Sequence, residues 1–263
     1  MILTRRAALN GSQLDQVDSR IVIRSMDPGV PHENIGAADR MGGAGQRMTA
    51  QHWQYIDASV TFAIDVPKKQ LALRREIFDK AKKWALAKGW LTFNYMTGKR
   101  LRVDKVVVPG SGDLWNWTNE YTITFRAYNV PFWQDSTATT EEIAAADENT
   151  GTITVPGEEE TVCDAEITNA SGSTIDALTV TVGSSSFEFS GLGLADEERL
   201  VIGHGDDGIL YIRKYTGTSY FVRVMDKRTG GSADDLYVQP GDNTITITGG
   251  DVTATVSCYG RYV

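Results

Sequence analysis

The sequence predicts a mainly β protein in two parts, an α+β part with one helix followed by an all-β part. Only residues 67–88 space their apolar side chains at helical intervals. Most other apolar residues fall in short strand-like runs that turn residues separate. The charge balance also changes sign: residues 1–134 carry 19 Lys and Arg against 12 Asp and Glu, whereas residues 135–263 carry 7 against 22. Such a step supports two domains.

The first part begins with a predicted strand, RIVIRSM (20–26), followed by Asp27-Pro28-Gly29. Proline presets φ and glycine tolerates positive φ, so these three residues predict a turn. Residues 29–48 contain five glycines and few strand formers, and we expect a long loop there. Loops of this length inside a domain are usually functional or partner-bound. The strand-like HWQYIDASVTFAIDV (52–66) then follows.

The predicted helix over about 67–88 has Pro67 at its start and Gly89 just past its end. Its apolar stripe consists of Leu71, Ile77, Phe78, Ala81, Trp84 and Ala85. The other face is basic, with Lys68, Lys69, Arg74, Arg75, Lys80, Lys82, Lys83 and Lys88. The favoured interpretation is a solvated face with two ion pairs, Glu76–Lys80 and Asp79–Lys83. A contact face for an acidic neighbour stays open. Nucleic-acid binding is disfavoured because no exposed aromatic residues are interleaved to stack bases.

Three further strands are expected after the helix, at 90–96, 100–108 and 120–128, and the last runs into VPFW (130–133). The polar composition of residues 135–150 predicts a linker. From residue 151 about ten short strand candidates follow at intervals of 8–12 residues, which is typical of a sandwich or barrel. The predicted organisation is therefore a domain over 1–134, a linker over 135–150 and a domain over 151–263.

No pattern in the sequence predicts catalysis, a cofactor or a metal. The three histidines, His32, His52 and His204, share no metal-ligand spacing, and GDDG (205–208) fits a hairpin turn better than a calcium loop. We therefore expect no enzyme. Two cysteines, Cys163 and Cys258, are too few for a disulfide scaffold. No apolar run is long enough for membrane insertion, and no secretion signal is recognisable, so we expect synthesis in a cytoplasm.

Aromatic residues in the second part allow two interpretations, a sugar-binding groove or packing on a sheet face. Packing is favoured because no tryptophan lies beyond Trp133. The residues concerned are Tyr211, Tyr215, Tyr220, Phe221, Tyr237 and Tyr259.

Six segments spread over most of the chain are each weak motifs, but their joint order and spacing are specific. They are RIVIRSM (20–26), YIDASVTFAIDV (55–66), REIFDKAKKWALAKGWLTF (75–93), EYTITFRAYNVPFW (120–133), FEFSGLGLADEERLVIGHGDDGILYI (187–212) and LYVQPGDNTITITGGDVTATVSCYGRYV (236–263). In this order and spacing the chain resembles the distal tail proteins of long-tailed phages and prophages. It departs from them at Val130, where the family usually has Asp before the Pro-aromatic element.

The resemblance implies a structural virion protein at the tail tip, made in the cytoplasm of a bacterial host. Its first domain would form a ring, a hexamer, between the tail tube protein and the tail-tip or baseplate hub protein. Its second domain would be a galectin-like β-sandwich that presents a receptor-binding protein, with a cell-surface glycan as a further candidate partner. Loop 29–48 and the basic helix are the candidate contact regions, represented by His32, Asn34, Arg40, Met41, Arg47, Lys69, Arg75 and Lys83.

Two alternatives stay open. One is a carbohydrate-binding module with an accessory domain, and the other is a different phage tail component, such as a tube or adaptor protein with an added β-domain. A galectin-like fold would not by itself decide whether the second domain binds sugar, because function depends on sites and not on folds.

Overall fold

The computed structural model describes residues 4–39, 46–110, 120–145, 149–205 and 208–263 of the chain, with the backbone alone over 35–39 and 46–51. The chain divides into two compact units, Met1–Trp133 with Val263, and Gln134–Tyr262. The structure is mainly β, as predicted, with antiparallel pairing throughout the described strand pairs. None of the described helices is both long and apolar enough to cross a membrane.

The first unit is built on two sheets. Its elements are β1 (Ala7–Leu9), β2 (Ser12–Gln13), α1 (Leu14–Val17), β3 (Ile21–Asp27), β4 (Pro31–Asp39), β5 (Gln46–Ile64), α2 (Leu71–Leu86), β6 (Gly89–Phe93), β7 (Lys99–Val103), β8 (Lys105–Val107) and β9 (Glu120–Ala127). One sheet has the order β3-β5-β9-β8, with β4 paired to β5, and the other contains β2-β1-β6-β7. Strand β10 (Trp133–Asp135) begins at the last residue of this unit.

Helix α2 packs its apolar stripe against β9. The Phe78 ring lies 5.1 Å from that of Tyr121, and the Trp84 ring lies 5.9 Å from that of Phe125. Strand β9 alternates between buried and less buried residues, as expected for a sheet with a helix on one face only. This arrangement agrees with the predicted α+β organisation.

The helix differs from its prediction in its ends and in two stripe residues. It begins at Leu71 and not near residue 67, because residues 67–70 form a turn that the Gln70 amide closes onto the Pro67 carbonyl. Leu71 is 46% exposed, whereas Arg74, expected on the solvated face, is fully buried. Arg74 fits there because its long stem packs along the apolar face and its guanidinium donates to the Tyr121 hydroxyl at 3.1 Å.

The long loop expected over 29–48 is largely a β-hairpin. Strand β4 pairs with β5 from Pro31↔Ile56 to Asp39↔Gln46, with two register shifts on the way. The prediction was wrong because this stretch is rich in Gly and Ala and poor in β-branched residues, so that cross-strand pairing, and not propensity, holds it extended.

The second unit consists of two sheets around one apolar core. Its strands are β11 (Thr139–Ile143), β12 (Thr150–Val155), β13 (Thr161–Asn169), β14 (Ile175–Val182), β15 (Ser185–Leu194), β16 (Arg199–His204), β17 (Leu210–Thr216), β18 (Tyr220–Arg223), β19 (Arg228–Gly230), β20 (Tyr237–Val238), β21 (Gly241–Thr248), β22 (Val252–Cys258) and β23 (Arg261–Tyr262), with the 3₁₀ turn η2 (Met225–Lys227). One sheet has the order β11-β22-β13-β16-β17-β18, with β20 paired to β13, and the other has the order β12-β21-β14-β15-β19.

The core of this unit draws buried side chains from both sheets, among them Val180, Phe187, Ile202 and Val256. Two layers of antiparallel strands with a shared apolar interior form a β-sandwich, one of the two architectures that the strand spacing predicted. Cys163 and Cys258 face each other across β13 and β22 as buried free thiols.

The stretch expected to be a linker, residues 135–150, is partly a strand. Residues 139–143 form β11, which pairs with β22 along its whole length and buries Ile143. Composition was misleading here because the strand TTEEI is mostly polar, and a strand at a sheet edge needs few apolar residues.

Candidate assembly interface

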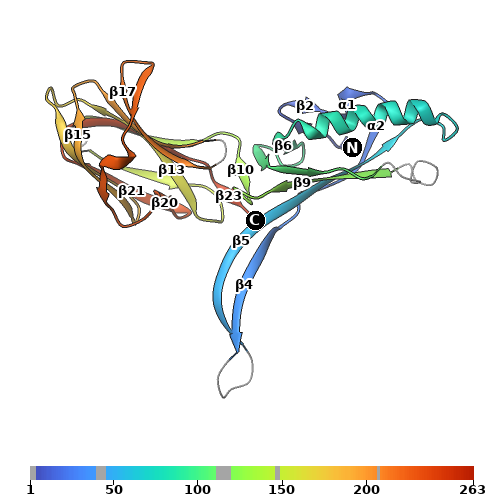
Figure 1. Cartoon of the computed structure of the whole chain (residues 1–263), viewed down its shortest axis with the longest axis horizontal. Coiled ribbons are helices and arrows are strands. Elements are labelled where there is room, and N and C mark those ends of the chain that lie inside the picture. Colours follow the sequence, from blue (N-terminus) through green and yellow to red (C-terminus); the bar gives the residue numbers. More distant parts are fainter. Residues whose placement is uncertain (1–3, 40–45, 111–119, 146–148, 206–207) are drawn as a thin grey trace. The chain divides into compact units, whose positions relative to one another are not determined.

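The β4–β5 hairpin is the most unusual feature of the first unit, and Figure 1 shows it leaving the sheet as an arm. Strand β5 pairs with β9 only from Ile56 onward, and its residues 46–55 pair with β4 alone among the described strands. These ten residues span about 33 Å at roughly 3.3 Å per residue. Within the described chain both edges of this two-stranded ribbon are free, and free strand edges can pair with another chain.

An aromatic and ionic cluster holds the base of the arm. The His32 ring stacks on Tyr55 with centroids 4.4 Å apart, and the Arg126 guanidinium lies 4.1 Å from the Tyr55 ring centroid. Arg126 also donates two hydrogen bonds to the Asp57 carboxylate, at 2.6 and 2.5 Å. A two-stranded hairpin is marginally stable by itself, and this cluster ties the base of the arm to β9.

A second set of contacts secures residues 27–29, between β3 and β4, where the chain enters the arm. The Asp27 carboxylate accepts a hydrogen bond of 2.9 Å from the Gly29 amide, as in an Asx turn. The Trp133 indole donates to the Pro28 carbonyl at 3.0 Å. Gly29 has φ +67°, and a Cβ there would lie 2.1 Å from the Asp57 carbonyl oxygen. The predicted Asp27-Pro28-Gly29 turn does not reverse the chain: β3 and β4 pair in succession with the same strand, from Asp27↔Ser59 to Pro31↔Ile56, so these residues form a bulge. Only glycine fits at position 29 of this bulge.

The contact residues predicted from the sequence fall into two groups. His32 and Asn34 are exposed on β4, and the Asn34 amide lies 3.4 Å from His52 on β5. Arg47 is in β5, where the backbone alone is described, and Arg40 and Met41 lie outside the described residues. Lys69, Arg75 and Lys83 belong to the turn before α2 and to α2 itself. The structure does not join the two groups, since the arm projects away from the helix (Figure 1).

The basic face of α2 is largely free of ion pairs. Lys80 pairs with Glu76 at 2.9 Å, as predicted, whereas Asp79 and Lys83 form no ion pair with any described residue. Lys69, Arg75 and Lys83 are exposed and likewise without an ion pair in the described part of the chain. This face therefore offers unneutralised positive charge to a neighbour.

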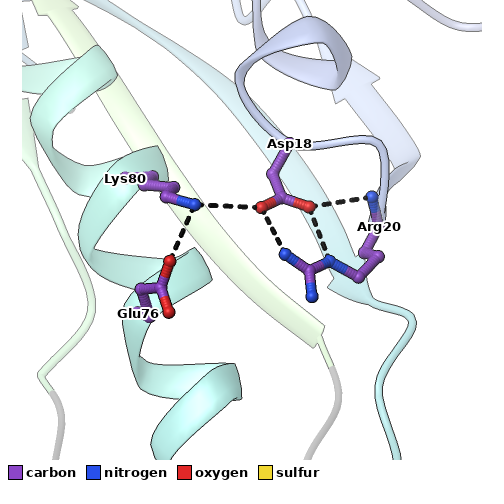
Figure 2. A network of polar contacts seen from close by, with 4 residues as sticks. All are labelled: Asp18, Arg20, Glu76 and Lys80. Atoms are coloured by element: carbon purple, nitrogen blue, oxygen red, sulfur yellow. Dashed lines mark hydrogen bonds and ion pairs between the residues drawn. The ribbon is translucent and has the colours of Figure 1, made fainter.

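A buried carboxylate anchors α2 beside the start of β3, as Figure 2 shows. Asp18 accepts two hydrogen bonds of 2.8 Å from the Arg20 guanidinium and one of 3.3 Å from Lys80. Its side chain is only 6% exposed. The hydrogen bonds from Arg20 outweigh the effect of burial and hold the pKa of Asp18 well below its ordinary value. This network sets the position of the basic helix on the sheet.

His204, the single histidine of the second unit, is held on both ring nitrogens. Its Nδ1 lies 2.6 Å from Asp164 and its Nε2 lies 2.8 Å from Asp235. Burial favours the neutral ring, but the two carboxylates outweigh burial and raise the pKa of His204 to about 9. With a carboxylate on each ring nitrogen, His204 links β16 to β13 and to the residue before Leu236. Among the described residues, no cluster of three or more His, Cys, Asp or Glu could hold a metal ion.

The sequence did not reveal two of these clusters. Tyr55, Asp57 and Arg126 meet only when β5 and β9 are in register, and Asp164 and Asp235 are 40 and 31 positions from His204. The available signal was the alternation in the strand predicted over 52–66, which places Tyr55 and Asp57 on one face.

Comparison with known structures adds evidence on the fold. The Dit protein of phage SPP1, described as a paradigm of the hub adsorption apparatus in phages that infect Gram-positive hosts, aligns with a TM-score of 0.69 at 10% identity. The alignment covers 98% of this chain and 99% of that one. A chain of the phage P2 baseplate in its activated conformation with Ca aligns at 10% identity with a TM-score of 0.49, over 99% of this chain and 100% of that one. A chain of the same baseplate with Sr aligns at 10% identity with a TM-score of 0.47, over 97% of each chain.

No protein-family model and no curated protein matches the sequence. The likeness is therefore one of fold, and it extends over both units of the chain. The chain has the fold of the SPP1 Dit protein, which confirms the resemblance to distal tail proteins at the level of fold.

Proposed function

We propose that this protein is a structural component of a phage tail tip, a hub that joins the tail tube to the tail-tip or baseplate proteins. The observation that carries the proposal is the full-length match to the Dit protein of SPP1. A match over 98% of the chain includes both units and leaves little room for an unrelated added domain. In this proposal the protein is not an enzyme and acts through its contacts.

The hub would be a ring of identical subunits, six in the form that the resemblance implies. A closed ring uses head-to-tail contacts, so each subunit needs two different surfaces that complement each other. The arm of β4 and β5 supports one such contact, because it carries free strand edges beyond the sheet. Exposed Lys69, Arg75 and Lys83 support a second contact, with an acidic surface of a neighbouring tail protein.

The second unit would be a galectin-like domain at the ring periphery that presents a receptor-binding protein or another tail-tip protein. Its two-sheet core supports an independently stable module. Its strongly acidic composition, 22 Asp and Glu against 7 Lys and Arg over residues 135–263, supports a role apart from the basic first unit. The location in this proposal is the virion tail tip, after synthesis in the bacterial host.

A shortened arm tests the ring. Asn34 and His52 are directly opposite each other, so residues 35–51 can be replaced by Asn-Gly, which closes a two-residue hairpin on that pair. The matched control is a triple variant of the helix face, Lys69→Gln, Arg75→Gln and Lys83→Gln, which leaves the arm intact. Sedimentation velocity measures assembly, and thermal unfolding checks that each variant is folded.

We expect the shortened arm to abolish assembly of the purified protein while its unfolding transition is retained. The helix variant should keep self-assembly and lose binding to an acidic tail partner. If the folded, shortened protein still assembles as the unchanged chain does, the arm is not the ring contact and this part of the proposal fails.

A further inference from the structure

A pocket of about 480 Å³ lies beside β17 and β18. These two strands carry four of the aromatic residues noted in the sequence, Tyr211, Tyr215, Tyr220 and Phe221. Its walls include the side chains of Ile209, Tyr211, Arg213, Arg223 and Met225. Ile209 and Met225 are 66% and 42% exposed. The volume falls within the roughly 300–1,000 Å³ of small-molecule sites, and exposed apolar groups with a few polar ones are typical of such sites.

Two arginines line this pocket side by side, and no described acid forms an ion pair with either of them. Arg213 on β17 and Arg223 on β18 are direct cross-strand partners. Like charges in this position destabilise a sheet unless something neutralises them. In the described part of the chain neither arginine forms an ion pair, and the buried Nε of Arg213 has no hydrogen-bond partner.

The lack of a counter-charge among the described residues is notable because this half of the chain is acidic. Residues 135–263 contain 22 Asp and Glu and only 7 Lys and Arg. Other basic residues of the same sheet have carboxylate partners: Arg199 pairs with Glu166, and Lys214 pairs with Glu198 at 3.3 Å. An unneutralised arginine pair in such a domain indicates a site for an external anion.

Aromatic rings position the Arg213 guanidinium. The Arg213 guanidinium lies 4.1 Å from the Tyr211 ring centroid and 4.5 Å from that of Phe221. Tyr211 lies across Gly203 on β16, where a Cβ would be 2.7 Å from the tyrosine hydroxyl. Glycine at 203 therefore provides the space that this tyrosine occupies.

We propose that this pocket binds an anionic saccharide. Its carboxylate or phosphate lies between Arg213 and Arg223, and the apolar face of the sugar ring packs against the exposed rim of Ile209 and Met225. The arginine pair requires the negative charge, and the apolar rim suits a ring that has one apolar face and a hydroxylated edge. The site lies within the second unit and does not depend on ring assembly.

The test uses calorimetry on the full-length protein with two matched pairs of probes. Mannose 6-phosphate is compared with mannose, and trigalacturonate with neutral galactotriose, so that the pairs separate phosphate from carboxylate. The charged member of at least one pair should bind at least about tenfold more tightly than its neutral partner, and added salt should weaken its binding.

Arg223→Gln should weaken binding of the charged probe about tenfold or more, since it removes a charge-assisted hydrogen bond. The same variant should unfold at the same or a higher temperature, because it also removes the like-charge pair. Arg199→Gln is the matched control, because it removes a positive charge from the same sheet that already has a carboxylate partner. Its affinity should stay within about twofold of the unchanged protein. Gly203→Ala should weaken binding by displacing Tyr211.

Several results would overturn the proposal. Charged and neutral probes could bind alike, no probe could bind, or Arg199→Gln could weaken binding as much as Arg223→Gln. Hexaglutamate could bind as tightly as the charged sugars and with the same dependence on Arg223, which would identify an acidic peptide as the ligand. Asp206 and Asp207 precede this strand in the sequence and lie outside the described residues. If binding appeared only in the Asp206→Asn, Asp207→Asn variant, the protein's own acids would occupy the arginines.

Discussion

The Asp57 carboxylate on β5 and the Arg126 guanidinium on β9 form a two-point ion pair, with distances of 2.6 and 2.5 Å, where the arm leaves the sheet. Both side chains are about one quarter exposed. Arg126 also covers the Tyr55 ring on which His32 stacks. One pair therefore connects the central strand, the neighbouring strand and the base of the arm.

We expect Asp57→Asn to lower the free energy of unfolding by about 1–3 kcal/mol, because Arg126 loses its charged partner in a partly buried site. Urea denaturation measures the change. Asp65→Asn, just beyond the end of the same strand and exposed, is the matched control and should change stability by less than about 0.5 kcal/mol. Equal effects of the two substitutions would show that the pair does not hold the base of the arm.

Gly29→Ala should destabilise the first unit by about 2 kcal/mol or more, since the new Cβ meets the Asp57 carbonyl and φ is positive. Gly98 also has positive φ, +76°, but nothing lies within 4 Å of a Cβ there. Gly98→Ala should therefore lower the free energy of unfolding by only about 1 kcal/mol, which is the cost of placing alanine at positive φ. Thermal unfolding compares the two. A Gly29→Ala protein as stable as the Gly98→Ala protein would contradict the close approach of position 29 to the Asp57 carbonyl.

Asp18 should make the protein sensitive to acid. Its folded-state pKa lies below the ordinary value of about 3.9, so its stabilising contribution is complete above about pH 4 and declines as the pH falls further towards the folded-state pKa. Asp18→Asn should lower stability at pH 7 by about 2 kcal/mol and flatten the decline below pH 4. Glu76→Gln, which removes the exposed partner of Lys80, should retain that decline. A decline of unchanged steepness in Asp18→Asn would contradict the role of Asp18.

His204 should have the opposite effect, in the alkaline range. Its pKa is about 9 in the folded state and about 6.5 when unfolded, so its contribution is complete below pH 6.5 and is lost as the pH rises through 9. His204→Gln should remove this loss, whereas His52→Gln should leave it. Denaturation at pH 6, 7.5 and 9 measures the slope, and the NMR shift of the His204 ring gives the pKa directly. A His204 ring with a measured pKa at or below 6.5 would contradict the stabilisation of its charged form by Asp164 and Asp235.

Much of the fold could be predicted because its signals are local. Alternation identified the strand expected over 120–128, which the structure has at Glu120–Ala127, and apolar spacing identified the helix that packs on the sheet. Elements stabilised by pairing with distant strands could not be found this way. Strand β4 has a composition typical of loops, and β11 has a composition typical of linkers, so both depend on partners far along the chain.

The candidate site was predictable only in outline. The sequence pointed to the region around His32 and Asn34 and to the basic helix, both of which the structure places on the first unit. It could not give the cluster at the base of the arm, because Arg126 lies 69 positions from Asp57 and meets it only through strand register. Arg74 was placed on the wrong face because helical spacing alone does not account for a long side chain that packs its stem against the core.

The central claim is that copies of this chain close into a ring. The most direct test is light scattering of the purified full-length protein over a concentration series, with negative-stain images of the same samples. The account predicts a closed annular particle, with a mass near that of six 28.8 kDa chains, about 173 kDa. A protein that stays at 28.8 kDa at every concentration, with no annular particles in the images, would contradict it.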